Sequence, residues 1–230
     1  MVNVLDKGFV KLEDSMGGDL RVVNSAKVSF VKHSSEVGEP EKKLINFLMK
    51  HRHGTPFEHS VFTFHVKAPI FVTREWQRHR IGSFNEMSGR YVEFEPDFYW
   101  PEQLRISAAT NKQGSVVPDT APENFVDVNN WNVHLREQIF DSYNSSFDDY
   151  KYLIDNGVAK EMARMVLPVS LYTEFYWTVN ARSLMNFLEL RSGQDAQWEI
   201  REYANAMMPM FEERMPATYE AWIANNRIAP

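Results

Sequence analysis

The sequence VFTFHVKAPIFVTREWQRHR occupies residues 61–80 and combines a strand pattern, a helix pattern and a basic segment. In its first part, Phe62, Phe64 and Val66 alternate with polar residues, which is typical of a strand with one buried face. Pro69 should end that strand, because proline cannot donate to a sheet ladder. A short helix is expected over residues 71–77, and it leads directly into the basic segment.

The rest of the chain mixes strand and helix patterns in the same way. Residues 171–179 alternate again and are rich in aromatic and β-branched residues, which predicts a second half-buried strand. The helical spacing of apolar residues predicts helices over residues 39–52, 139–154, 159–166, 180–190 and from about 195 to 211. Asn180 is a suitable N-cap and Gly157 a suitable C-terminal cap, whereas Pro209 should kink the last helix.

The length of 230 residues suits a single α+β domain over residues 1–230, with a core that needs no covalent cross-links. Residues 106–130 are polar and show no sustained period, so we expect a variable surface excursion there. The sequence contains no cysteine, which excludes disulfides, thiolate metal sites and thiol nucleophiles. It shows neither a signal-peptide pattern nor an apolar run of membrane-spanning length, so a cytoplasmic location away from the membrane is expected.

Charge is distributed unevenly along the chain. The net charge of −6 argues against a surface that attracts nucleic acid. Residues 74–90 nevertheless contain four arginines and a histidine against two glutamates. A local basic cluster in an acidic protein fits a small anionic ligand better than a long polyanion. A solvated basic face remains the alternative on charge alone.

The basic segment contains suitable groups for holding such a ligand. Neither a G-x-G-x-x-G nor a G-x-x-x-x-G-K-[ST] motif is present, so a flavin or nucleotide would have to be held by side chains and loop amides. Arg78, Arg80 and Arg90 can each form bidentate bonds with phosphate oxygens. Hydroxyl and backbone N–H groups of Ser88 and Gly89 can converge on an anion.

The order of the residues is more specific than their charge. Residues 78–91 read RHRIGSFNEMSGRY, and nine fixed residues over these fourteen positions match R-H-R-x-x-S-x-N-E-x-S-x-R-Y. This segment resembles the motif of flavin-dependent thymidylate synthases. The similarity extends over residues 51–80, 167–172 and 177–187, and so over most of the chain outside residues 101–131.

The resemblance implies an activity, a fold and an assembly. Members of this family methylate dUMP to dTMP with 5,10-methylenetetrahydrofolate as carbon donor and FAD as cofactor, which a nicotinamide such as NADPH reduces. We therefore expect a methyltransferase with the family's α+β fold, in which helices pack against an antiparallel or mixed sheet. We also expect a homotetramer whose active sites are shared between subunits.

The resemblance also assigns residues to the two ligands. The expected FAD contacts are His53, Thr55, Arg78, His79, Arg80, Glu86, Asn180, Arg182 and Asn186, with Thr55 lent by a neighbouring subunit. The expected dUMP contacts are Glu75, Trp76, Gln77, Arg78, Glu86, Met87, Ser88, Gly89, Arg90, Arg164 and Arg191. Ser88, Arg90 and Arg164 should lie near the phosphate.

Arg191 matches the arginine that polarises the uracil ring, and we expect it to be the catalytic residue. Methylation at C5 of uracil requires electron density at that carbon, and a permanently charged guanidinium can stabilise the anion that develops on the ring. A cysteine thiolate, the alternative means of activating uracil, is excluded by the composition.

Two positions depart from the relatives' pattern. Glu75 stands where glutamine is usual near the dUMP phosphate, and its carboxylate would repel the ligand unless Arg74 or Arg78 neutralises it. Asp195 stands where some relatives have a histidine near the flavin.

Several alternatives compete with these assignments. Ser88 could be a nucleophile, but no histidine stands in an obvious partner position. His51, His53, Glu58 and His59 have the composition of a metal cluster, although their spacing matches no known ligand pattern, so we predict no metal site. A nucleotide-binding regulatory protein without catalysis is the alternative function, and the matched flavin contacts argue against it.

Overall fold

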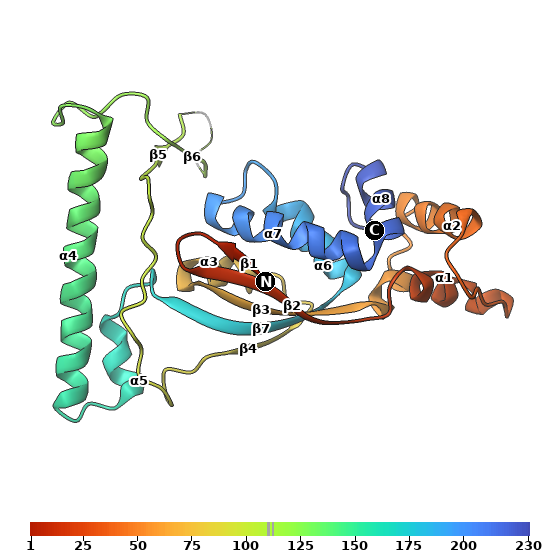
Figure 1. The fold of residues 1–230 in the computed structure, drawn as a ribbon, viewed down its shortest axis with the longest axis horizontal. Coiled ribbons are helices and arrows are strands. Elements are labelled where there is room, and N and C mark those ends of the chain that lie inside the picture. Colours follow the sequence, from red (N-terminus) through yellow and green to blue (C-terminus); the bar gives the residue numbers. More distant parts are fainter. Residues whose placement is uncertain (110, 112) are drawn as a thin grey trace.

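A five-stranded antiparallel sheet forms the centre of the molecule (Figure 1). The computed structural model describes residues 1–109, 111 and 113–230. The strands lie in the order β1 (Val2–Val4), β2 (Gly8–Met16), β3 (Val61–Pro69), β7 (Tyr172–Asn180) and β4 (Ser83–Glu86). The two strands predicted from the sequence, β3 and β7, pair along their whole length. The antiparallel form of the α+β expectation is therefore confirmed.

Helices cover one face of this sheet and one of its ends (Figure 1). The face is covered by α3 (Ile70–Trp76), α6 (Ala181–Arg191) and α7 (Trp198–Arg214). The end is covered by α1 (Asp19–Lys27), α2 (Glu39–Lys50) and α8 (Pro216–Ala224). The 3-10 turn Val28–Phe30 follows α1, and the 3-10 turn Thr55–His59 leads from α2 toward β3. No helix in the described ranges is long and apolar enough to cross a membrane.

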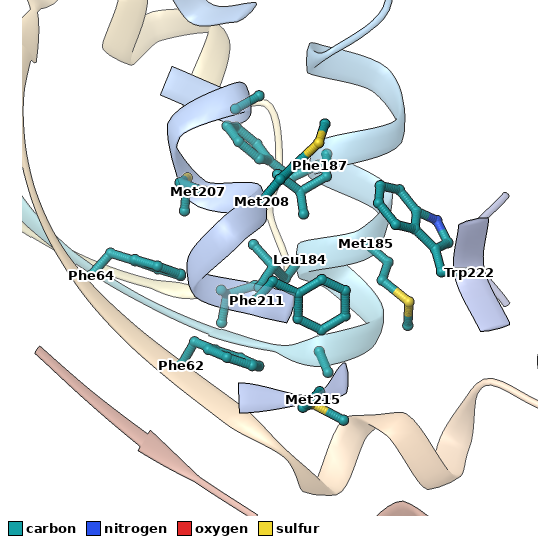
Figure 2. Close-up of a cluster of buried hydrophobic side chains, with 14 of the residues drawn as sticks. Phe62, Phe64, Leu184, Met185, Phe187, Met207, Met208, Phe211, Met215 and Trp222 are labelled. Atoms are coloured by element: carbon teal, nitrogen blue, oxygen red, sulfur yellow. The ribbon is translucent and has the colours of Figure 1, made fainter. Parts of the chain in front are cut away.

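The main hydrophobic core lies between the sheet and these helices (Figure 2). Phe62 and Phe64, from the alternating face of β3, point toward Leu184 of α6 and Phe211 of α7 (Figure 2). The methionines of α7 fill the remaining space, and Met207 is fully buried. Burying these large side chains supplies most of the favourable free energy that holds helices and sheet together.

A second, smaller core lies at the other end of the sheet, beside α4 (Val128–Asp155). Tyr150 of α4 is fully buried there against Phe94 and Ala163. The short helices α5 (Lys160–Ala163) and η3 (Arg164–Val166) complete this region. Figure 1 shows α4 as a long helix that stands apart from the helices over the sheet.

The ends of several elements agree with the sequence, and others differ. Asn180 caps α6 by accepting a hydrogen bond from the Ser183 amide, and Gly157 adopts a positive φ of 84° just after α4. The helix expected from residue 195 begins at Trp198 and continues through Pro209, and α8 follows as a separate helix. In the excursion, strands β5 (Ile106–Ser107) and β6 (Ser115–Val116) form a short hairpin that periodicity did not reveal.

Candidate active site

Three adjacent candidate residues lie at the C-terminal end of α3: Glu75, Trp76 and the capping residue Gln77. Trp76 is fully buried, with its ring centre 4.7 Å from that of Phe187 and 5.3 Å from that of Phe175. This anchor fixes the position of its neighbours Glu75 and Gln77. The core encloses the indole, so a contact between Trp76 and dUMP would have to be made by its backbone, and this contact stays a prediction.

Glu75, His79 and Arg191 form a group that we call the arginine cluster. Arg191 ends α6, and its Nη1 donates to the Glu75 carboxylate at 2.8 Å, while Nη2 donates to the Glu75 carbonyl at 3.1 Å. Its Nε donates to Nε2 of His79 at 3.0 Å. Glu75 is therefore neutralised by Arg191, whereas the sequence suggested Arg74 or Arg78. No local sequence pattern indicates this pair, because its members lie 116 positions apart in the chain.

His79 is neutral in this cluster. Burial, together with the adjacent Arg191 guanidinium, lowers the pKa of His79 from 6.5 to about 4. At neutral pH the imidazole is therefore neutral, and the bond from Arg191 selects the tautomer with the proton on Nδ1 and a bare Nε2 acceptor. A charged imidazole would instead face the guanidinium with a second positive charge.

A cavity of about 960 Å³ opens beside the cluster. It brings together five residues expected to contact FAD or its phosphates, namely Arg78, His79, Arg80, Arg182 and Asn186. Arg182 and Asn186 are exposed and four residues apart on α6, whereas Leu184, Phe187 and Leu188 point into the core. The volume is in the usual range for a cofactor site, and arginine forks with an amide suit a diphosphate and polar rings.

The cavity also has lining residues to which the sequence assigned no contact with FAD or dUMP. Its wall includes Arg52, Glu58 and the segment 228–230. The Arg182 guanidinium donates to the Glu58 carboxylate at 2.6 Å and to the Pro230 carbonyl at 2.8 Å. Glu58 thus pairs with an arginine, which argues against its alternative assignment to a metal cluster. In the described part of the chain no group of three or more potential metal ligands is found.

Gly54 is required for the position of Arg182. A Cβ atom at residue 54 would lie 2.4 Å from the Arg182 Nε, which is far inside van der Waals contact. His53 stacks on Phe47, and Thr55 is exposed at the start of the turn Thr55–His59. Neither His53 nor Thr55 lines the large cavity, so their contacts with FAD stay predictions.

The loop formed by residues 86–90, which we call the anion loop, follows β4. The Glu86 carboxylate accepts bonds from Gln77 Nε2 at 3.2 Å and from Thr173 Oγ1 at 2.9 Å. The Met87 amide donates to the Glu174 carbonyl at 2.8 Å. The first half of the loop is therefore an extension of the sheet, and Glu86 adjoins the end of α3.

The second half of the anion loop meets α5. Arg90 pairs with the Glu161 carboxylate at 2.9 Å, and Arg164 donates to the Glu161 carbonyl at 3.3 Å. The Arg90 amide donates to Ser88 Oγ at 3.3 Å. A Cβ atom at residue 89 would lie 2.3 Å from the Phe94 ring, so glycine is needed there. The structure thus brings Ser88, Arg90 and Arg164 to one place, away from the large cavity.

Another cavity, of about 520 Å³, also borders the arginine cluster and shares Arg78 and Arg191 with the larger one. Its lining includes Glu75, Arg78, Gln113, Arg191 and Asp195. Asn111 donates to the Asp195 carboxylate at 3.0 Å. The polar excursion therefore reaches the candidate site, which its sequence did not indicate.

A family model described as "Thymidylate synthase complementing protein" (Thy1) matches residues 11–217. The chain belongs to the Thy1 family. This confirms the resemblance found in residues 78–91.

Curated relatives and solved structures agree with the Thy1 assignment. The chain is 50% identical over 224 residues to the flavin-dependent thymidylate synthase of Thermosipho africanus, covering 96% of this chain and 92% of the relative. It is 49% identical to the enzyme of that name from Thermotoga neapolitana, with coverage of 96% and 94%. A crystal structure of the UMP/dUMP methylase PolB from Streptomyces cacaoi, bound with 5-Br UMP, superposes with a TM-score of 0.85 at 37% identity, covering 100% and 99% of the two chains.

Proposed function

We propose that this Thy1-family chain methylates dUMP to dTMP, with 5,10-methylenetetrahydrofolate as carbon donor and FAD, reduced by NADPH, as hydride carrier. The observation that carries the proposal is the position of Arg191. It is held by Glu75 and His79 at the edge of a cavity lined by Arg78, Arg80 and other donors. A permanently charged group stands beside a site with the shape and donors for a flavin.

The residues that would hold FAD come from the basic segment and from α6. Arg78 and Arg80 can bind the diphosphate as bidentate forks, and Arg182 and Asn186 offer further donors along the same wall. Arg182 is engaged by Glu58 and by the Pro230 carbonyl, so it would exchange these partners when a ligand binds. When bound, FAD supplies the hydride that completes the methyl group.

The role of Arg191 is to stabilise negative charge on the uracil ring. Its guanidinium cannot lose its proton at physiological pH, so it donates hydrogen bonds throughout the reaction. One such donor, placed where charge develops, contributes roughly 2–4 kcal/mol to transition-state stabilisation. By stabilising the anionic form of the ring, the guanidinium allows electron density to build up at C5 without a covalent bond between protein and ring.

The anion loop would bind the phosphate of dUMP. Arg90 and Arg164 both contact Glu161, and Ser88 accepts a hydrogen bond from the Arg90 amide. The Arg90–Glu161 pair is exposed, and exposed pairs contribute only about 0–1 kcal/mol. A phosphate can therefore displace Glu161 at little cost.

We also infer that the enzyme is a homotetramer with active sites shared between subunits. Supporting this, the large cavity is not lined by the anion loop, and Thr55 and His53 lie outside it as well. A neighbouring subunit would bring such separated residues to one ligand. A cytoplasmic location and the single-domain interpretation stay predictions of the sequence.

The test is the visible spectrum of the purified protein, followed by product analysis. We expect a yellow protein that releases FAD and forms dTMP from dUMP when given NADPH and 5,10-methylenetetrahydrofolate. UMP should be offered in parallel, because the PolB structure is that of a UMP/dUMP methylase. A colourless protein that cannot be reconstituted with FAD would contradict the proposal.

A further inference from the structure

The Arg191 guanidinium is fixed from three directions. A guanidinium carries five N–H donors, and three of them are engaged by His79 Nε2, the Glu75 carboxylate and the Glu75 carbonyl. Two N–H groups, one on each terminal nitrogen, make no hydrogen bond to the residues that the structure describes, and these can face a ligand. Such a three-point hold sets the plane of the group before any substrate arrives.

The partners of Arg191 are themselves immobilised by the main core. Glu75 precedes the fully buried Trp76 at the end of α3, and Trp76 packs on Phe187 of α6. Arg191 ends that same α6. The His79 ring packs edge-on against Phe187 with ring centres 5.0 Å apart. One aromatic contact region thus fixes both sides of the ion pair.

Among the described residues that line the cavity at Arg191, positive and negative side chains are equal in number. Glu75, Asp195, Arg78 and Arg191 line one cavity, so two carboxylates face two guanidinium groups. Asp195 is bound by Asn111 and Glu75 by Arg191. Arg191 therefore meets a ligand as one half of a half-buried ion pair, with side-chain exposures of 20% for Arg191 and 33% for Glu75.

We propose that Glu75 is the positioning residue of the reaction: it fixes the guanidinium plane of Arg191 through its carboxylate and carbonyl, and its charge sets how strongly Arg191 attracts an anionic uracil ring. This assignment rests on the proposed function. It gives Glu75 a role at the uracil end of dUMP, whereas the resemblance implied a position near the phosphate.

Two substitutions separate the orienting role from the charge. Glu75→Gln keeps an acceptor for Arg191 Nη1 and removes the negative charge, whereas Glu75→Ala removes both. The control is Glu13→Gln, because Glu13 pairs with Lys11 at the same 2.8 Å and its side chain is also partly exposed, at 25%. All proteins are prepared as holoenzymes, and the flavin spectrum verifies that each has folded and bound FAD.

The first readout is steady-state kinetics with dUMP. We expect Glu75→Ala to lower kcat by about tenfold or more, because the guanidinium loses its orientation, while Glu75→Gln retains most of kcat. In an Arg191→Ala background, Glu75→Ala should have no additional effect on dUMP affinity, because Glu75 acts through Arg191. If Glu75→Ala and Arg191→Ala weaken dUMP binding additively in the double variant, the proposal is overturned.

The second readout is the pH dependence of binding of 5-fluoro-dUMP, a probe whose N3 ionises readily. In Glu75→Gln the site gains one net positive charge, which favours the N3 anion. The apparent pKa for binding should therefore fall by about one to three units, the usual effect of one charge at ~4–6 Å. A purely structural role for Glu75 would leave this pKa unchanged.

The outcomes distinguish a failure of the proposed function from a failure of the positioning role of Glu75. If the wild type and Glu13→Gln hold FAD but make no dTMP, the proposed function fails. If both are active and Glu75→Ala keeps kcat within twofold of the wild type, the positioning role of Glu75 is wrong. An unshifted profile of 5-fluoro-dUMP binding in Glu75→Gln refutes the charge effect.

Discussion

The arginine cluster and the anion loop each contain an arginine that we expect to contact dUMP, but they hold it differently. In the arginine cluster, Arg191 is bound by two partners that the main core fixes, and it is only 20% exposed. In the anion loop, Arg90 is 62% exposed and pairs with Glu161 across the surface. The first arrangement suits a group that must be oriented before the reaction, and the second suits one that exchanges partners when substrate binds.

Removing Arg191 from the arginine cluster, or an arginine at the anion loop, tests whether the two regions differ in function. Arg191→Ala should lower kcat for dTMP formation by about 10²- to 10³-fold, the usual loss for one oriented donor. FAD should stay bound, because Arg78, Arg80 and Arg182 are unchanged. Kinetics and the flavin spectrum measure both effects, and near-normal turnover would refute the role of Arg191.

Loss of an arginine at the anion loop should have a smaller effect, and this effect should be on KM for dUMP. Arg90→Ala and Arg164→Ala should each raise the KM for dUMP by about 10- to 100-fold, the value of a charge-assisted bond, and leave kcat nearly unchanged. Initial-rate measurements over a range of dUMP concentrations decide this. A loss confined to kcat would mean that the anion loop, too, acts mainly in the transition state.

Gly54→Ala tests whether Arg182, in the wall of the large cavity, holds FAD. The added Cβ would lie 2.4 Å from Arg182 Nε and would push the guanidinium out of place, so FAD should bind roughly tenfold more weakly. Gly38→Ala is the control, because the nearest atom to its Cβ would be 3.5 Å away. Equal FAD affinity in both variants would show that Arg182 does not hold the cofactor.

The smallest expected effect is on the pH dependence of the free energy of unfolding. His79 has its pKa lowered to about 4 by burial and by Arg191, whereas the unfolded chain protonates near 6.5. The unfolded state therefore binds more protons between these values, so stability is full above pH 6.5 and is lost as the pH falls toward 4. His79→Gln keeps an acceptor for Arg191 and should remove that part of the loss, on the order of 1 kcal/mol after solvent screening. Denaturant unfolding at pH 7 and pH 4.5 measures it, and an equal loss in both proteins would contradict the assignment.

Local patterns predicted much of this molecule. The alternation in β3 and β7 gave the two central strands, and the N-cap at Asn180 gave the start of α6. Both signals are carried by neighbouring residues. The hairpin of β5 and β6 was missed, because two-residue strands show no period.

The site was predictable by residue type and motif, but its internal contacts were not. The Glu75–Arg191 pair joins the ends of two helices separated by 116 positions, and only packing of the core brings them together. The burial of Trp76 likewise depends on Phe175 and Phe187, which come from later elements. The motif indicates candidate site residues, and the fold determines which of them contact one another.

Anaerobic mixing of the reduced holoenzyme with dUMP and 5,10-methylenetetrahydrofolate tests the central claim most directly. The flavin should reoxidise as dTMP appears in equal amount, and in Arg191→Ala it should stay reduced on the same time scale. Flavin that stays reduced in the wild type, or dTMP that forms without flavin oxidation, would contradict the account.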